Sequence, residues 1–321
     1  MRKLNGKTRF YIQMVCEGQP FQKPRNKVSH GLVGLDIGPS TIAIAAPTHE
    51  RAELRQFCDK LRNDQGKVRV EQRKLDRQRR ANNPLNYNEN GTVKNGAKKW
   101  VKSKNYHSTQ RRLSETNRKL AAHRESLHGQ LVNHVFSLGN NVNLEKLSYR
   151  AFQKMFGKSV GMRAPGMFVS MLKRKAVSAG VSVTEFPTRT TKLSQVCLCG
   201  QVKKKSLSER WHICECGVVA QRDLFSAFLA SCVESERLNA ELAQELWSSG
   251  MDTCLRAALS EAKPAIGGGF PATFGLKGSQ SGSPVEVWIK AGDGRGVVAS
   301  VSQRREPDKA CTNRGTPRLP L

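Results

Sequence analysis

The alternation of apolar and polar stretches along the chain predicts an α/β protein. Short apolar runs rich in β-branched residues, each ending in Gly, Pro or polar residues, predict strands over residues 8–16, 31–37, 41–46, 140–145 and 181–186. Apolar residues three and four positions apart predict helices from about 51 to 80 and over residues 107–136, 165–179, 223–231 and about 232–262. Gly38 and Pro39 separate two of these strands, which are therefore expected to form a hairpin in a buried sheet.

The segment 51–138 differs from the rest of the chain in its charge. Residues 51–130 hold 21 Lys and Arg but 8 Asp and Glu. Residues 82–99 interrupt the helical pattern with Asn, Gly and Pro, which indicate a loop. We therefore expect two long basic helices, antiparallel and joined by a flexible basic tip.

The chain as a whole is strongly basic, because 54 Lys and Arg outnumber 26 Asp and Glu among its 321 residues, a net charge of +28. Such a charge attracts polyanions, so nucleic acid is the leading partner class. The absence of a long apolar run and of a visible secretory signal argues against a membrane span and a secreted protein, and we expect a cytoplasmic, nucleoid-associated one. From residue 263 on, Gly, Ser and Pro dominate, so residues 263–321 are expected to be disordered except for one short strand at 285–289.

Four of the nine cysteines form two tight pairs, Cys197-Leu-Cys199 and Cys214-Glu-Cys216. Four thiolates complete the tetrahedral coordination of a structural Zn²⁺, and two pairs on successive turns are typical of a zinc ribbon. Each pair is one residue shorter than the usual C-x-x-C, so four buried or coincidental cysteines remain the alternative. His212 could be a spare ligand, but it is expected to face solvent on the hairpin.

Three acidic residues, Asp36, Glu145 and Asp223, each lie at the end of an apolar segment or the start of a helix. Carboxylates that converge in a basic cleft can bind a pair of Mg²⁺ ions, which activate water for phosphodiester hydrolysis. Taken singly, the same residues are a turn Asp, a surface Glu and a helix N-cap Asp, and their spacing cannot decide between these interpretations.

The order of these motifs resembles the TnpB (OrfB) family of insertion-sequence proteins, which are related to type V CRISPR effector nucleases. Asp36-Ile-Gly38 followed by Ala43 is similar to the first RuvC motif of that family, and Glu145 in NLEKLS is similar to the second. Ser194-Gln195-Val196-Cys197 resembles the start of its zinc ribbon. Arg222-Asp223 with Ala227 resembles the third RuvC motif. The resemblance covers roughly residues 8–231.

This resemblance implies a RuvC/RNase-H-like domain with an inserted basic helical hairpin and an inserted zinc ribbon. Its expected segments are a wedge-like strand and linker (1–30), RuvC-like part I (31–50), the hairpin (51–138), part II (139–190), the ribbon (191–221), part III with a C-terminal helix (222–262) and the tail (263–321).

The resemblance also implies an RNA-guided DNA endonuclease. Asp36, Glu145 and Asp223 would hold catalytic Mg²⁺ or Mn²⁺, and the four cysteines would hold structural zinc. A guide RNA and a DNA target would be gripped through their backbones by the cations of the hairpin: Arg73, Lys74, Arg77, Arg79, Arg80, Lys98, Lys99, Lys102, Lys104, Arg111 and Arg112. Trp100 and Tyr106 could stack on bases or pack the hairpin.

The chain departs from the family pattern in two further places. Its start corresponds to the end of the family's N-terminal half, so we expect the recognition lobe to be missing, or supplied by a partner chain. Phe225 stands where the family has an Asn two residues after its last catalytic Asp. The alternative function is therefore a catalytically degenerate nucleic-acid-binding protein with a zinc ribbon and no nuclease activity.

Overall fold

The computed structural model forms two units, Met1–Gly275 and Leu276–Leu321. The residues it describes are 2–4, 7–15, 17–18, 23–96, 98–206, 208–262, 271–276, 285–290 and 296–301. In the second unit, β12 (Val285–Lys290) and β13 (Gly296–Val301) form an antiparallel hairpin. The strand expected at 285–289 is thus confirmed and has a partner strand. Most of the remaining tail, for which disorder is expected, lies outside the described residues.

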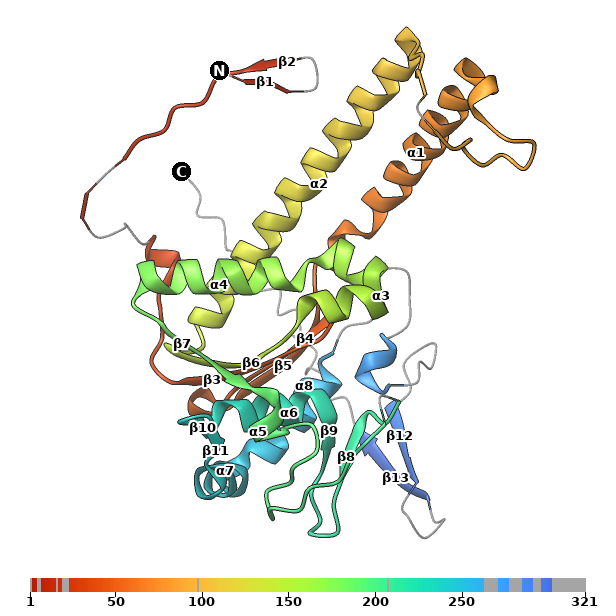
Figure 1. Cartoon of the computed structure of the whole chain (residues 1–321). Helices are drawn as coiled ribbons and strands as arrows, with labels where there is room; N and C mark the ends of the chain where they lie inside the picture. Colours follow the sequence, from red (N-terminus) through yellow and green to blue (C-terminus); the bar gives the residue numbers. More distant parts are fainter. Residues whose placement is uncertain are drawn as a thin grey trace, which may run out of the picture. The chain divides into compact units, whose positions relative to one another are not determined.

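A five-stranded mixed sheet forms the centre of the first unit (Figure 1). Its strands have the order β5-β4-β3-β6-β7: β5 (Arg51–Gln56), β4 (Thr41–Ala46), β3 (Leu32–Ile37), β6 (Asn141–Lys146) and β7 (Ser182–Pro187). β3, β4 and β5 are joined antiparallel, whereas β6 runs parallel to β3 and β7 parallel to β6. Four of the predicted strands, including the β3–β4 hairpin, are therefore confirmed.

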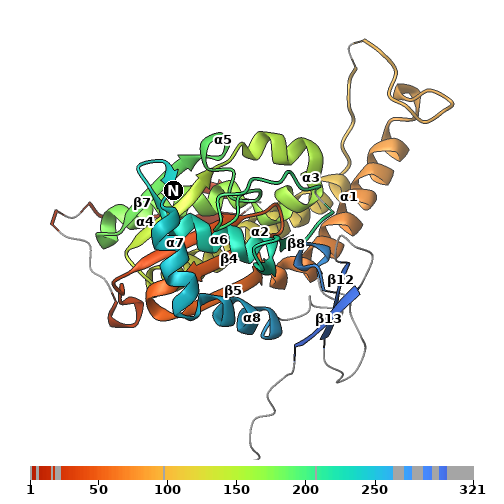
Figure 2. The ribbon, with the colours of Figure 1, turned by 90° about the horizontal axis from the view of Figure 1, so that it is seen from below.

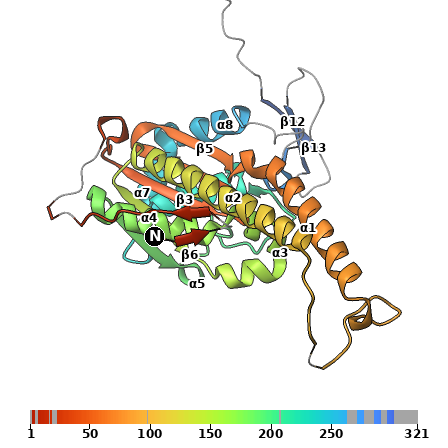
Figure 3. The ribbon, with the colours of Figure 1, turned by 90° about the horizontal axis from the view of Figure 1, so that it is seen from above.

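Helices cover both faces of this sheet. On one face, α2 (Lys104–Phe136) and α4 (Pro165–Ala179) bury an apolar core that includes Leu35, Ile44, Phe136 and Phe168 (Figure 3). On the other face, α6 (Arg222–Ser231) packs on β3 and β4, and α8 (Asp252–Ser260) packs on β5 (Figure 2). The predicted helices over 107–136, 165–179 and 223–231 are confirmed.

The approach of α6 to the sheet depends on small residues of β3 and β4. Side chains alternate along a strand, so Val33 and Leu35 point into the core and Gly34 faces α6. A Cβ atom built on Gly34 would lie 1.9 Å from the carbonyl oxygen of Ala227 in α6. Gly34 is paired with Ala45, which also lacks bulk. The helix therefore rests directly on the strand backbones.

The basic segment begins later than its sequence pattern predicts. Residues 51–56 form β5 rather than a helix, and the apolar spacing that suggested a helix comes from the strand and the turn after it. Cys58 in that turn has a left-handed φ of 47°, which a helix would not contain. α1 (Arg62–Asn82) then runs antiparallel to α2 (Figure 1).

The tip between α1 and α2, expected to be flexible, is tied by side-chain hydrogen bonds. The side-chain amide of buried Asn83 donates to the carbonyls of Arg79 (2.8 Å) and Val101 (2.9 Å) and accepts from the Val101 amide (2.7 Å). The short 3₁₀ turn η4 (Pro84–Asn86) follows, and Asn86 donates to the carbonyl of Lys99.

Two other expectations were wrong in part. The strand expected over 8–16 extends only through β2 (Lys7–Arg9), which pairs with β1 (Arg2–Leu4), while residues 10–15 are exposed and belong to no strand. The helix expected over about 232–262 is broken because Ser235 and Glu236 adopt left-handed φ and turn the chain between β10 (Val233–Glu234) and β11 (Arg237–Leu238). α7 (Ala240–Leu246), a π-helical turn η5 (Trp247–Met251) and α8 follow.

The remaining elements connect the sheet to its insertions. They are α3 (Tyr149–Arg163), α5 (Thr188–Thr191), β8 (Trp211–Ile213), β9 (Val219–Gln221) and the 3₁₀ turns η1 (Pro24–Asn26), η2 (Pro47–His49), η3 (Asp59–Leu61) and η6 (Ala272–Phe274). The short turn η6 lies in the region expected to be disordered, yet its Phe274 is 1% exposed. Within the described part of the chain, no helix combines the length and the apolar character needed to cross a bilayer.

Candidate functional site

Asp36 and Glu145 occupy neighbouring positions on parallel strands. Leu35 of β3 is in register with Leu144 of β6, so the next residue of each strand, Asp36 and Glu145, lie side by side on adjacent strands. Both belong to the face that α6 covers, because they alternate with the core residues of their strands. Both also lie at the carboxyl ends of the two strands, the edge at which parallel sheets bind ligands.

Asp223 reaches the same place from α6. It lies in the first turn of that helix, whose close packing on Gly34 brings its start toward Asp36. Asp36, Glu145 and Asp223 line one cavity of about 380 Å³. Ala43, the residue paired with Asp36 on β4, lines it as well, so a small side chain stands opposite the carboxylate.

Among the described residues, three cations line this cavity: Lys205, Arg210 and Arg222. Arg222 belongs to the third sequence motif, which assigns it no role, and Lys205 and Arg210 belong to no motif. Arg222 lies 3.4 Å from the carboxylate of Asp223 and donates to the backbone carbonyls of Ser206 (3.1 Å) and Glu209 (2.7 Å). One guanidinium thus joins the start of α6 to the loop before β8. The sequence signal for Lys205 and Arg210 is their basic character between the two cysteine pairs, whereas Arg222 directly precedes Asp223 in its motif.

Burial dominates the electrostatics of the three acids. It raises the pKa of Glu145 to about 7. The pKa of Asp36 is raised well above its usual value by burial first and then by the charges of Asp223 and Glu145. The pKa of Asp223 is also raised by burial, while Arg222 and Arg210 oppose the rise. A cation among these groups would favour their ionised forms.

Two buried hydroxyls in the cavity support the same interpretation. Among the described residues, neither Ser226 Oγ nor Thr273 Oγ1 has a hydrogen-bond partner, and both residues line the cavity. Buried polar atoms without partners are rare and call for a water or an ion. Three carboxylates with orphaned hydroxyls fit a hydrated divalent cation, which prefers oxygen ligands.

The four cysteines converge as expected. Their Sγ atoms all lie within 4.8 Å of one another, with Cys197 3.5 Å from Cys216 and Cys199 3.6 Å from Cys214. A Zn–S length of about 2.3 Å places the sulfurs of a tetrahedral site roughly 3.8 Å apart. The cluster could therefore hold a metal such as zinc. Burial raises the pKa of the Cys197 thiol, and a bound metal would act in the opposite direction.

The shortened pairs converge because each makes the same tight turn. The amide of Gly200 donates to the carbonyl of Cys197 (3.0 Å), and the amide of Gly217 to that of Cys214 (3.1 Å). Both glycines have left-handed φ, 80° and 90°, so a larger residue would be strained in either turn. The C-x-C-G spacing is therefore compatible with a four-sulfur site.

His212, expected to face solvent, is instead 2% exposed. Its ring lies 4.4 Å from that of Phe225, and its Nδ1 is hydrogen-bonded to Lys205. Phe225 also packs against Phe228 and Trp247. This aromatic cluster joins β8 to α6, the helix that carries Asp223.

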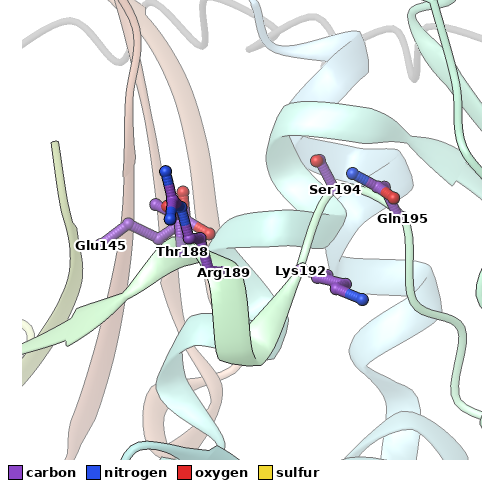
Figure 4. A pocket seen from close by; sticks show the side chains of 6 residues that line it. All are labelled: Glu145, Thr188, Arg189, Lys192, Ser194 and Gln195. Atoms are coloured by element: carbon purple, nitrogen blue, oxygen red, sulfur yellow. The ribbon is translucent and has the colours of Figure 1, made fainter. Parts of the chain in front are cut away.

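A second cavity of about 510 Å³ adjoins the first (Figure 4). Glu145, Ser194 and Gln195 line both cavities. The second is completed by Thr188, Arg189 and Lys192 of α5 and the loop that follows it. In Figure 4, Glu145 lies on one side of this cavity and Ser194 and Gln195 on the other.

The cations expected to bind nucleic acid divide into two groups. Some already have partners within the hairpin: Arg79 and Arg80 are 2.9 Å from Asp76, Arg112 is 3.5 Å from Glu71, and Lys102 lies over the Tyr106 ring. Lys98 is half-buried and donates to the carbonyl of Gly96 at 2.7 Å. The others are exposed and form no ion pair with the described residues: Arg73, Lys74, Arg77, Lys99, Lys104 and Arg111.

Of the two aromatic residues in this region, Tyr106 is 8% exposed, which favours packing over base stacking. Trp100 is half-buried between Arg79 and the ring of Tyr87.

The fold and the two clusters define an α/β protein with a carboxylate cavity at the carboxyl edge of its parallel strands and a four-cysteine site beside it. Residues 166–229 match the family model described as Cas12f1-like, TNB domain. The matched range contains all four cysteines and Asp223, and it supports a relationship to the TnpB/Cas12f-like family of RNA-guided nucleases. A comparison with curated proteins gives no match.

Proposed function

We propose that this chain is an RNA-guided DNA endonuclease of the TnpB/Cas12 type, with a RuvC-like, metal-dependent centre made by Asp36, Glu145 and Asp223. The observation that carries the proposal is that these three carboxylates, 78 to 187 residues apart in the chain, line one cavity. The order of the sheet strands and the match to the Cas12f1-like TNB domain support it.

The three carboxylates would hold Mg²⁺ or Mn²⁺, which supplies an activated water and stabilises the leaving oxygen of a phosphodiester. The chain itself supplies the surrounding charge. Lys205 and Arg210 line the same cavity and would bind the non-bridging oxygens of the phosphate. Arg222 is already engaged with Asp223 and two carbonyls, so its role is to orient that carboxylate.

The basic hairpin would grip the guide RNA and the RNA–DNA duplex through phosphates. The exposed cations of α1 and α2 carry this function, whereas Arg79 and Arg80 are partly neutralised by Asp76. Each phosphate contact on a duplex makes the fall of log K, the binding constant, with log salt concentration steeper by about 0.9. Binding should therefore weaken steeply as salt rises.

The test is cleavage of DNA by the full chain purified with co-expressed RNA. We expect cutting that requires Mg²⁺ or Mn²⁺, and Asp36→Asn or Asp223→Asn should reduce it by at least about 100-fold. Glu245→Gln, an exposed acid on α7, is the matched control and should cut like the wild type. Equal cutting by Asp36→Asn and the wild type would overturn the proposal.

Phe225 favours a second candidate, a nucleic-acid-binding protein that does not cut. A buried phenyl ring stands where the family has an amide, so one polar group of the family's centre is missing. This candidate predicts tight, salt-sensitive binding of RNA with no metal-dependent cleavage in the same experiment.

A further inference from the structure

The cavity beside the acids is rich in hydrogen-bond donors. Arg189 and Lys192 contribute two cations, Thr188 and Ser194 two hydroxyls and Gln195 an amide. Among the described residues, Glu145 is the one acid that lines it, and it shares this residue with the carboxylate cavity. Such a set of donors suits a phosphate, which offers acceptors only.

Both cations are available to a ligand. Arg189 and Lys192 are exposed, and no ion pair between described residues involves either of them. By contrast, Lys173 on the other face of the sheet is engaged by Glu185 at 2.6 Å. On this side of the sheet, Arg189 and Lys192 thus keep their charges available at the edge of the cavity.

The loop that carries these groups is held in place from both ends. The carbonyl of Lys192 accepts from the amides of Gln195 (2.8 Å) and Val196 (3.1 Å), and Lys192 itself has a left-handed φ of 46°. Thr191 is buried, and the loop continues directly into Cys197 of the four-sulfur site. The backbone that carries the donors is thus fixed before a ligand arrives, which lowers the entropic cost of binding.

We propose that Arg189 and Lys192, with Thr188, Ser194 and Gln195, bind a backbone phosphate of the DNA strand being cut, one that flanks the phosphate held by the carboxylate cavity. The proposal rests on the nuclease function above for the identity of the strand. Its geometric basis is continuity, because Glu145, Ser194 and Gln195 line both cavities. A DNA strand that has one phosphate beside Glu145 places the adjacent phosphate in the second cavity.

The first arm of the test measures binding of single-stranded DNA to the full chain, with Ca²⁺ replacing Mg²⁺, over a range of salt concentrations. Arg189→Gln and Lys192→Asn each remove one charge, and Asn tolerates the left-handed backbone of residue 192. Each should lower the salt slope by about 0.7, the value for one contact to a single strand. Arg174→Gln, an exposed cation of α4 on the other face, should leave it unchanged.

The second arm measures cleavage of DNA carrying one neutral methylphosphonate linkage at successive positions around the cut. At one flanking linkage the wild type should lose about tenfold in kcat/KM, whereas the doubly substituted Arg189→Gln/Lys192→Asn protein should lose nothing further. If the wild type cuts, both single variants keep the salt slope of Arg174→Gln, and the double variant is as sensitive to the methylphosphonate as the wild type, the phosphate site is refuted and the nuclease function stands. If nothing cuts but the salt slopes fall as expected, Arg189 and Lys192 do bind a DNA phosphate, and it is the nuclease function that is refuted.

Discussion

Replacing Gly34 with alanine is expected to spoil the carboxylate cavity without touching a carboxylate. Gly34 lies two residues before Asp36 on the same face of β3, directly beneath α6. The helix carries Asp223 in its first turn and meets Gly34 one and two turns later, at Ala227 and Ser231. Any movement that frees space for a methyl group at residue 34 therefore moves Asp223 relative to Asp36.

The size of this movement follows from the packing. The added Cβ would lie 1.9 Å from the Ala227 carbonyl oxygen, where contacts under 3.0 Å are essentially never found, so α6 must retreat by about 1.1 Å. The obstacle is backbone on both sides, so no side-chain rotation can relieve it. Overpacking of this kind costs about 1–3 kcal/mol of stability, and a displacement of about 1 Å at a reacting centre can cost 100-fold in rate.

Two readouts test this reasoning: the rise in melting temperature caused by Mn²⁺, and DNA cleavage per folded molecule. Gly139→Ala is the matched control, because its Cβ would lie 2.5 Å from the Gly31 carbonyl oxygen at the opposite end of the strands. We expect Gly139→Ala to lose stability but keep its response to Mn²⁺, and Gly34→Ala to lose both the response and about 100-fold in cleavage. A folded Gly34→Ala protein that responds and cuts like Gly139→Ala would refute the coupling between α6 packing and the acids.

Three further predictions follow from the same geometry. Burial raises the folded-state pKa of Glu145 to about 7, so the stability present below its unfolded pKa is lost as pH rises through 7. Without metal at pH 8, Glu145→Gln should therefore raise the free energy of unfolding by about 3 kcal/mol, with no gain at pH 4. Denaturant titration measures both values, and an equal gain at the two pH values would contradict a raised pKa. Cys197→Ser should abolish zinc binding, measured by metal analysis, and lower the melting temperature. The control Cys254→Ser in α8 should keep one zinc per chain, and zinc retained in Cys197→Ser would count against the four-sulfur site. The double variant Arg73→Ala/Arg77→Ala should lower the salt slope of duplex binding by about 1.8. The double variant Arg79→Ala/Arg80→Ala should lower it by less, because Asp76 already pairs with both of these arginines. Equal slopes for the two double variants would contradict the distinction between paired and unpaired cations.

Much of the fold could be predicted because the buried strands and helices carry strong local signals. β4 is buried at all six positions and reads as one apolar run, and the core face of α4 repeats every three to four residues. β5 gave the opposite signal: its Arg51–Gln56 sequence is polar, and only pairing with β4 and cover from α8 make it a strand. Such tertiary contacts are absent from a local window of sequence.

The site likewise has parts with a local sequence signal and parts that depend on tertiary contacts. The repeated spacing C-x-C-G predicted the four-sulfur cluster because the two cysteines of each pair lie close together in the chain. The motifs around Asp36, Glu145 and Asp223 indicated acids of interest, but their presence in one cavity depends on the β3–β6 register and on Gly34. The sequence predicts a solvent-facing His212 because alternation along a hairpin does not reveal that Phe225 of α6 packs against this ring of β8.

The turn at Thr273 has a consequence for the order in which the protein matures on the ribosome. Chains emerge N-terminus first and fold as they do so. Asp223 therefore emerges 50 residues before Thr273, the last described residue along the chain that lines the cavity. Thr273 is joined to the finished domain through its carbonyl, which accepts from the Gln221 side chain at 3.2 Å. Until residue 273 has emerged, the cavity lacks the part of its wall that Thr273 provides. A nascent chain halted before residue 273 would thus carry Asp36, Glu145 and Asp223 without the hydroxyl group that Thr273 adds to their cavity.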